Sequence, residues 1–184
     1  LCAELFPKHA GANTIGMILL NHGIFSFGAS ARESYERMIA LVDRAERHLD
    51  NRKAWSLNHT TIETAGAPIA DIAALRSEIS RAAGFPMVMA THRDARTLSF
   101  IARRDLATIS QQGPATPDHV IRTKRLPMLG RDVAAFTRDY RAYFELHNAG
   151  AKEPKTMLDP APRLVLDAGI GMCTLGRTMK DADI

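Results

Sequence analysis

One pattern occurs twice in the chain and restricts its possible folds more than any other feature: an apolar strand, a glycine turn, a second strand and a capped helix. Gly28 of the first copy aligns with Gly176 of the second. The turn glycines and the helix-capping residues then coincide as well, in the pairs Gly23 with Gly171, Ser26 with Thr174, Ser30 with Thr178 and Glu33 with Asp181. Such self-similarity predicts two related units. We expect the first unit to need residues before Leu1 and the second to need residues after Ile184.

The first copy predicts a hairpin followed by a long helix. Residues 14–20 and 24–27 are short β-rich apolar segments, separated by an Asn-His-Gly turn. Ser30 precedes Glu33 by three positions, which is the spacing of a capping box and predicts a helix start. The helix is expected to reach about Leu49, with an apolar stripe at three- and four-residue steps: Tyr35, Met38, Ile39, Val42, Ala45 and Leu49.

Helices and strands alternate through the rest of the chain. Residues 50–68 lose the periodicity, so a linker is expected over 58–68. One helix is predicted to have Pro68 in its first turn and to end at Gly84 in the left-handed conformation. Asp94 and Thr116 are predicted to cap the starts of two further helices. An aromatic stripe from Phe136 to His147 predicts another helix, whose aromatic side chains are expected to pack in the core. Strands are predicted at 86–91, 106–110, 163–166 and 172–175, and a last helix near 178. This alternation favours an α/β layered architecture, divided into residues 1–57 and 69–184.

Composition excludes several classes of protein. Apolar residues make up 46% and charged residues 24%, which argues for a folded chain rather than a disordered one. The net charge of +4 is spread along the chain, so we expect small anions and no nucleic acid as partners. The longest apolar run, residues 15–20, is too short for a membrane-spanning helix, which needs roughly 20 residues. Cys2 and Cys173 are expected to stay reduced in a cytoplasmic protein.

His22 is the residue of the first copy that is best suited to a chemical role. A histidine in a glycine-bounded turn can present its imidazole to a zinc ion, for which neutral imidazole is a common ligand. The alternative is that His22 bonds to nearby backbone and stabilises the turn. One ligand is not a site, and the six other histidines show no paired metal-binding spacing. The aligned position in the second copy is Ile170, so that copy would lack the same chemistry.

Residues 18–28, ILLNHGIFSFG, followed by ARESYE at 31–36, resemble the C-terminal signature of class II aldolase/adducin domains. In that family a histidine before glycine supplies the third zinc ligand, so the resemblance implies this role for His22. It also implies a layered class II aldolase-like sandwich, of which residues 1–57 would be the C-terminal part. Residues 69–184 would then be a second, degenerate and incomplete unit of the same kind.

A second segment extends the resemblance over most of the chain. Residues 113–127, GPATPDHVIRTKRLP, resemble part of bacterial bifunctional proteins that join a rhamnulose-phosphate-type aldolase to a short-chain dehydrogenase. This implies zinc-dependent retro-aldol cleavage of a phosphorylated deoxysugar ketose, and a homo-oligomer. The family's His-x-His ligand pair is absent from these residues and is expected before Leu1. The dehydrogenase's glycine-rich turn is absent too and is expected after Ile184.

The basic segment near position 122 is a candidate phosphate site. Arg122 and Lys124 follow a predicted helix start, where backbone N–H groups also favour anions. The alternative is that both side chains are simply solvated, and His119 has no identifiable partner ligand. Three functions therefore compete: an aldolase that is inactive as these 184 residues alone, a non-catalytic aldolase/adducin-type assembly or scaffold module, and, least favoured, nucleic-acid binding by residues 122–131.

Overall fold

The computed structural model describes residues 2–20, 22–56, 66 and 68–184. The chain forms two compact units, Leu1–Asn58 and His59–Ile184. Both units contain helices and strands, so the fold is mixed α/β, as the sequence predicts. In the described residues no helix is long and apolar enough to cross a membrane. Cys2 and Cys173 are both free thiols.

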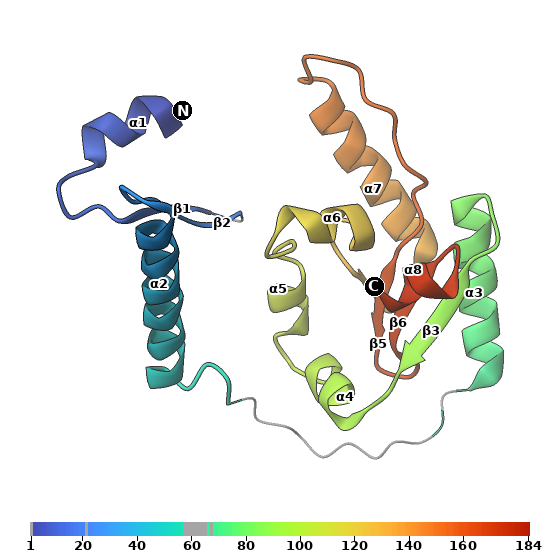
Figure 1. The fold of residues 1–184 in the computed structure, drawn as a ribbon. Helices are drawn as coiled ribbons and strands as arrows, with labels where there is room; N and C mark the ends of the chain where they lie inside the picture. Colours follow the sequence, from blue (N-terminus) through green and yellow to red (C-terminus); the bar gives the residue numbers. More distant parts are fainter. Residues whose placement is uncertain (1, 21, 57–65, 67) are drawn as a thin grey trace. The chain divides into compact units, whose positions relative to one another are not determined.

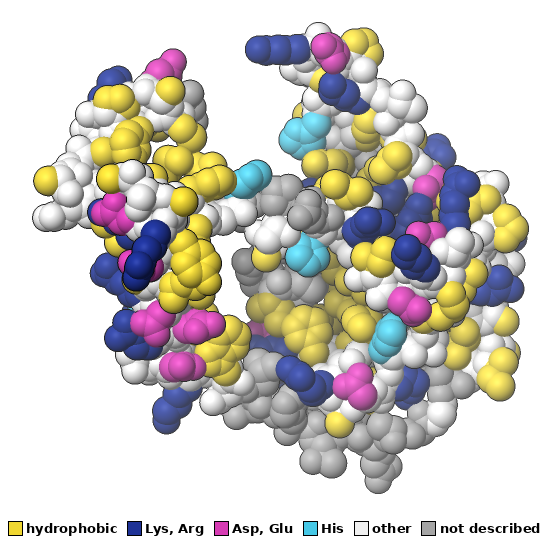
Figure 2. Space-filling model, in the orientation of Figure 1, with side chains coloured by type: hydrophobic (Ala, Val, Ile, Leu, Met, Phe, Trp, Pro, Cys, Tyr) yellow, Lys and Arg dark blue, Asp and Glu magenta, His cyan; other side chains and the backbone are white. Residues whose placement is uncertain are grey.

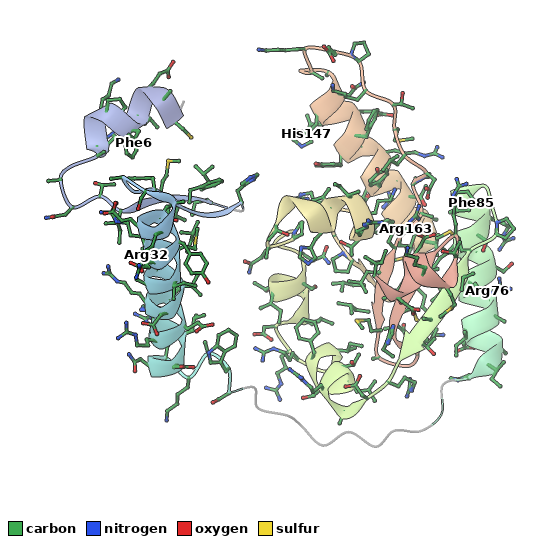
Figure 3. The ribbon with its side chains drawn as sticks, in the orientation of Figure 1. Phe6, Arg32, Arg76, Phe85, His147 and Arg163 are labelled. Atoms are coloured by element: carbon green, nitrogen blue, oxygen red, sulfur yellow. The ribbon has the colours of Figure 1, made fainter. Side chains whose placement is uncertain are left out.

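The first unit is a hairpin carried on a long helix. Its elements are α1 (Cys2–His9), β1 (Gly16–Leu19), β2 (Gly23–Ser26) and α2 (Ala31–Asn51) (Figure 1). β1 and β2 pair antiparallel, from Gly16 opposite Ser26 to Leu19 opposite Gly23, which confirms the predicted hairpin. Phe6 projects from α1 (Figure 3). Its ring meets the Phe27 ring edge to face, with centroids 5.2 Å apart.

The start of α2 shows how the sequence fixes this unit locally. The Ser30 hydroxyl accepts a hydrogen bond from the Glu33 N–H at 3.2 Å, as predicted. The Glu33 carboxylate reaches back one residue further than a capping box requires and accepts from the Ala29 N–H at 2.6 Å. Four of the predicted apolar stripe residues remain exposed: Tyr35 at 68%, Ile39 at 52%, Val42 at 41% and Ala45. None of the described residues of this unit is buried.

The second unit is built on a four-stranded sheet in the order β3-β6-β5-β4. The strands are β3 (Val88–His92), β4 (Met128–Leu129), β5 (Leu164–Asp167) and β6 (Gly171–Gly176). The helices are α3 (Ile69–Ala83), α4 (Ala95–Ile101), α5 (Leu106–Ser110), α6 (Pro117–Thr123), α7 (Val133–Asn148) and α8 (Met179–Asp183). β6 is antiparallel to both β3 and β5, whereas β4 and β5 are parallel.

The core of the second unit lies between this sheet and helices α3 and α7. Leu75 and Ile79 of α3 and Val133 of α7 pack with sheet residues such as Val165 and Cys173, all at most 3% exposed. Burial raises the pKa of the Cys173 thiol to about 11. Phe136 packs partly against the core, as predicted, but Tyr143 and His147 are exposed, so the aromatic stripe does not pack in the core along its whole length.

Most predicted helix boundaries of the second unit are confirmed. Gly84 ends α3 in the left-handed conformation at φ 80°, and the Asp94 carboxylate caps α4 by accepting from the Thr97 N–H at 3.1 Å. Pro68 is the residue just before α3 rather than part of its first turn. Thr116 precedes α6 as predicted, but its hydroxyl caps no backbone N–H and instead bonds to His119 Nδ1 at 2.7 Å.

The strand predicted at 106–110 is wrong, because these residues form helix α5. Five residues are too few for hydrophobic periodicity to separate a strand from a helix. Asp105 decides the outcome: its carbonyl accepts from the N–H groups of Thr108 and Ile109, which closes the first helical turn. The Arg103 guanidinium donates to both carboxylate oxygens of Asp105, at 2.8 and 2.7 Å, and holds it in place.

The two hairpins have the same register when 148 is added to each residue number. Gly16 lies opposite Ser26 in the first hairpin, and Leu164 lies opposite Thr174 in the second. The bond from the Phe27 N–H to the Ile15 carbonyl recurs as the bond from the Leu175 N–H to the Arg163 carbonyl.

The glycines that follow the two hairpins make the same approach to the next helix. A Cβ added to Gly28 would lie 2.9 Å from the Ser34 nitrogen, and one added to Gly176 would lie 2.7 Å from the Ala182 nitrogen. Ser34 and Ala182 differ by the same 148 positions. The strand pairing and the close approach of the following helix therefore correspond in the two units.

Candidate functional site

His22 lies at the tip of the β1–β2 hairpin, where the local sequence leaves its side chain exposed. The His22 N–H donates to the Leu19 carbonyl at 3.0 Å and closes the turn. Gly23 follows at φ 146°, a backbone conformation that favours glycine. The His22 ring lies nearly parallel to the Phe25 ring, with centroids 6.0 Å apart and planes inclined by 14°.

Among the described residues, the His22 imidazole makes no hydrogen bond within the turn. Within the part of the chain that the structure describes, neither ring nitrogen of His22 has a hydrogen-bond partner, and the turn is closed by the backbone N–H instead. His92 and His119, by contrast, bond through their rings to the hydroxyls of Thr174 and Thr116. An exposed imidazole with free nitrogens can bind a metal ion.

The described residues do not supply the other donors of a metal site. No group of three or more His, Cys, Asp or Glu side chains that could hold a metal ion occurs among residues 2–20, 22–56, 66 and 68–184. A catalytic zinc site needs about three protein ligands. His22 therefore fits the role of a single donor, and this part of the chain does not make a complete site.

Arg122 and Lys124, the two predicted phosphate-binding residues, lie in different environments. Arg122 is exposed on α6 and lines a pocket of about 380 Å³ together with His119, Ile121, Thr123 and Ile184. A guanidinium in this position can bind a phosphate through two parallel hydrogen bonds. Lys124 does not line this pocket.

Lys124 is only 5% exposed. Its ammonium donates to the Asp159 carbonyl and lies 4.0 Å from the centroid of the Tyr140 ring. Burial lowers the pKa of Lys124 to about 8, although the Asp159 carboxylate opposes this and Arg163 reinforces it. The structure thus places Lys124 in a contact between α7 and the segment before β5, and not in the pocket that Arg122 lines.

Comparison with known proteins identifies the family. The family model for the second domain of class II aldolases matches residues 67–184. The chain belongs to the class II aldolase family. The uncharacterized oxidoreductase YuxG of Bacillus subtilis (strain 168) is 23% identical over 189 residues, which covers 88% of this chain and 26% of YuxG. The chain therefore spans about a quarter of the length of this curated relative. No solved structure matches.

The class II aldolase match covers nearly all of the second unit, and His22 lies outside it. The turn of the second unit that corresponds to the His22 turn is built differently. Ile170, which aligns with His22, is fully buried, at 0% exposed. In the first unit the His22 N–H donates to the Leu19 carbonyl. In the second unit the Ile170 N–H donates instead to a side chain, Asp167 Oδ1, at 2.7 Å.

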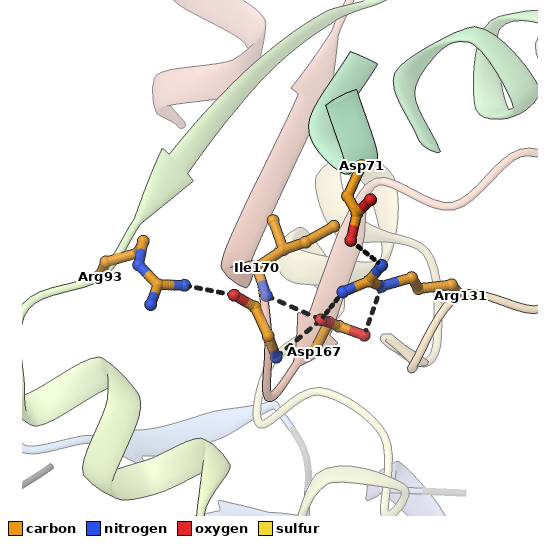
Figure 4. Close-up of polar contacts among 6 residues, drawn as sticks. Asp71, Arg93, Arg131, Asp167 and Ile170 are labelled. Atoms are coloured by element: carbon orange, nitrogen blue, oxygen red, sulfur yellow. Dashed lines mark hydrogen bonds and ion pairs between the residues drawn. The ribbon is translucent and has the colours of Figure 1, made fainter. Parts of the chain in front are cut away.

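A charged network around this second turn was missed by sequence reasoning (Figure 4). Arg131 donates to both oxygens of Asp167 and to Asp71 Oδ2 at 2.7 Å, and Arg93 donates to the Gly169 carbonyl at 2.7 Å. Burial raises the pKa of Asp167, but the hydrogen bonds from Arg131 and from backbone N–H groups outweigh it and lower the pKa overall. The only signal in the sequence is an Asp at a strand end before a glycine turn.

Proposed function

We propose that the chain is part of a zinc-dependent class II aldolase that cleaves a phosphorylated deoxysugar ketose, similar to rhamnulose 1-phosphate, and that His22 is one ligand of the metal. The observation that carries the proposal is the exposed His22 imidazole, whose two nitrogens have no partner among the described residues. Membership of the class II aldolase family supports the reaction class.

The design of the turn supports this role for His22. The backbone N–H of His22 closes the turn, so the ring nitrogens of the imidazole are not needed for that hydrogen bond. The ring is held nearly parallel to Phe25, which restricts its orientation without occupying its nitrogens. A ligand whose orientation is fixed in advance loses less conformational entropy when it binds a metal ion. The remaining donors would come from outside the described residues.

Arg122 is our candidate for the contact with the substrate phosphate. It is the predicted phosphate-binding residue that lines a pocket, whereas Lys124 is buried against Asp159 and Tyr140. Lys124 would then act indirectly, by holding the end of α6 in place.

The test uses the full-length protein and two histidine variants. In His22→Ala we expect the zinc content, measured by inductively coupled plasma mass spectrometry, to fall by at least half and retro-aldol turnover to fall at least about 100-fold. The matched control is His9→Ala, which removes an exposed histidine of α1 and should change neither quantity. Unchanged zinc content and turnover in His22→Ala would refute the proposal.

A second candidate function is a non-catalytic aldolase/adducin-type assembly module. The observation that favours it is that no three-donor metal cluster occurs in the described residues. This candidate predicts that the full-length protein, supplied with zinc and with ketose phosphates, shows no retro-aldol activity but still forms a homo-oligomer. Light scattering coupled to size-exclusion chromatography would measure the oligomer, and turnover above background would exclude this function.

We also propose that the two units are related copies, with residues 1–57 as the C-terminal part of an aldolase-like domain and 69–184 as a degenerate unit joined by 58–68. The identical hairpin registers support this relationship. The replacement of His22 by the buried Ile170 supports the loss of metal chemistry from the second copy.

A further inference from the structure

A groove between α3 and α7 is the feature of the second unit that the proposed function does not use. Its volume is about 680 Å³, within the range of roughly 300 to 1,000 Å³ that small-molecule sites have. The two helices contact each other, and small side chains beside the contact leave the groove open: Ala82, Ala134 and Ala142. Val133 lines the groove and belongs to the core, so the groove lies directly against the packed interior.

Three guanidinium groups line this groove. They belong to Arg81 of α3 and to Arg138 and Arg141 of α7, which are all exposed. In the part of the chain that the structure describes, Arg81 and Arg141 form no ion pair, and Arg138 pairs with its neighbour Asp139 at 3.3 Å. Figure 2 shows several Lys and Arg side chains, in dark blue, over the part of the second unit where α3, α7 and α8 lie. Guanidinium groups in this number favour an anion with several acceptor oxygens, such as a phosphate.

The Thr137 hydroxyl provides an independent observation in the same groove. Thr137 lines the groove, and its Oγ1 is buried without a hydrogen-bond partner among the described residues. A threonine in a helix can bond to the carbonyl four residues earlier, here that of Val133, and this bond is not made. A buried hydroxyl without a partner is unfavourable, and a missing ligand accounts for one. Threonine has two favourable χ1 rotamers in a helix, so a rotation about χ1 can present this hydroxyl to a ligand.

Two carboxylates complete the polar lining and restrict the ligand further. Glu78 of α3 and Glu145 of α7 form no ion pair with other described residues, although guanidinium groups line the same groove. Guanidinium groups outnumber carboxylates in the lining, so its net charge is positive. A carboxylate accepts hydrogen bonds from hydroxyl groups and repels a bare anion. A ligand that suits the whole lining therefore carries hydroxyl donors as well as a phosphate.

We propose that the groove between α3 and α7 binds a phosphorylated sugar or a similar phosphorylated polyol. The phosphate accepts hydrogen bonds from the three guanidinium groups and from the Thr137 hydroxyl, and the hydroxyl groups of the ligand donate to the two carboxylates. The groove shares no lining residue with the pocket that Arg122 lines. The inference therefore depends neither on zinc and His22 nor on the proposed phosphate contact of Arg122.

Isothermal titration calorimetry of the full-length protein tests this site, with glucose 6-phosphate, fructose 6-phosphate and inorganic phosphate as probes. We expect one or both sugar phosphates to bind at least about 10-fold more tightly than inorganic phosphate, and Arg141→Ala to weaken that binding at least about 10-fold. Arg104→Ala is the matched control, because it removes the same charge from an exposed position outside the groove, and it should leave the affinity unchanged. Equal affinities of the two variants, or no binding of either sugar phosphate, would overturn the inference.

The variant Arg122→Ala separates this site from the proposed function. Binding in the α3–α7 groove should be unchanged in Arg122→Ala, whatever happens to retro-aldol turnover. If sugar phosphate binding were lost in Arg122→Ala and kept in Arg141→Ala, the probe would occupy the other pocket and the inference would be wrong.

Thr137→Val distinguishes a ligand-binding role from a structural one, because valine has nearly the same shape and no hydroxyl. We expect Thr137→Val to weaken sugar phosphate binding about 3-fold or more. Chemical denaturation should show that the unliganded variant is more stable than the unchanged protein, since a buried hydroxyl without a partner is removed. A loss of stability with unchanged affinity would mean that the hydroxyl serves the fold and would contradict the proposal.

Glu78→Ala tests the part of the lining that selects the hydroxyl groups of the ligand. It should weaken the binding of the sugar phosphate at least about 3-fold and should not weaken that of inorganic phosphate, because inorganic phosphate gains nothing from a carboxylate. Unchanged binding of the sugar phosphate, or equal weakening of both probes, would exclude the assignment of this groove to a phosphorylated sugar.

Discussion

The Arg131 guanidinium donates two hydrogen bonds to the Asp167 carboxylate, from Nε to Oδ2 and from Nη2 to Oδ1, each 3.0 Å long. The same carboxylate accepts from the N–H groups of Gly169 and Ile170. One ion pair therefore joins the start of α7, the end of β5 and the turn that leads into β6. The Asp167 side chain is only 11% exposed, so its charge depends on these partners.

Removal of the guanidinium should weaken the second unit. In Arg131→Ala we expect the free energy of unfolding to fall by about 1 to 2 kcal/mol, because two charge-assisted bonds to a mostly buried carboxylate are lost. Chemical denaturation monitored by circular dichroism measures the change. Arg104→Ala, at an exposed arginine, is the control and should cost less than about 0.5 kcal/mol. Equal losses in the two variants would refute this role of Arg131.

Asp167 should also make stability depend on pH in the acid range. Its pKa in the folded protein lies below 3.8, the ordinary value. The unfolded state therefore binds more protons in this range, and the stability that Asp167 contributes is present above pH 3.8 and lost as the pH falls through the lower, folded pKa. Asp167→Asn should be less stable than the unchanged protein at pH 6. The difference should shrink below pH 3.8, and a constant difference from pH 6 to pH 2.5 would contradict it.

The lowered pKa of Lys124 should make the stability of the protein depend on pH in the alkaline range as well. Its pKa is about 8 when folded and 10.5 ordinarily, so between these values the unfolded state holds more protons. Stability should rise as the pH increases from about 8 to 10.5, relative to the variant Lys124→Met, by up to about 3 kcal/mol. Asp159, Arg163 and Tyr140 surround the ammonium and remain in both proteins. A stability difference that does not change over this range would exclude the shifted pKa.

The features of the fold that could be predicted from the sequence are those that depend on residues close together in the chain. The Ser30 and Asp94 caps and the left-handed Gly84 depend on contacts within four positions, and the hairpin pairs residues at most ten positions apart; all were predicted correctly. The helix at 106–110 was not, because five residues are too few for hydrophobic periodicity to separate a helix from a strand.

The candidate site could be predicted only in part, for a related reason. The exposure of His22 follows from its turn, which is local. The burial of Lys124 depends on Asp159, which is 35 positions away, so spacing alone could not separate Lys124 from Arg122. The charged network at the second turn joins Asp71, Arg131 and Asp167 from three distant segments, and no short motif marks it.

The glycine after the second hairpin should tolerate no side chain. A Cβ on Gly176 would lie 2.4 Å from the Asp181 Cβ and 2.7 Å from the Ala182 nitrogen, so α8 would have to move. We expect Gly176→Ala to lower the free energy of unfolding by about 1 to 3 kcal/mol. Gly150→Ala is the control, because nothing lies within 4 Å of its added Cβ. An unchanged stability of Gly176→Ala in chemical denaturation would refute the close approach.

The two turns differ at the aligned positions 22 and 170, where His22 is exposed and Ile170 is buried. Exchanging the two residue types should therefore change the free energy of unfolding little at position 22 and strongly at position 170. His22 is exposed and its ring has no hydrogen-bond partner in the described part of the chain, so His22→Ile should change the free energy of unfolding by less than about 0.5 kcal/mol. Ile170 is 0% exposed, so Ile170→His buries an imidazole in an apolar core and should cost about 2 to 4 kcal/mol. Because protonation would require a buried charge, the cost should increase as the pH falls below about 6.5. Equal costs for the two variants at pH 7 would mean that the turns share one environment, contrary to the burial of Ile170.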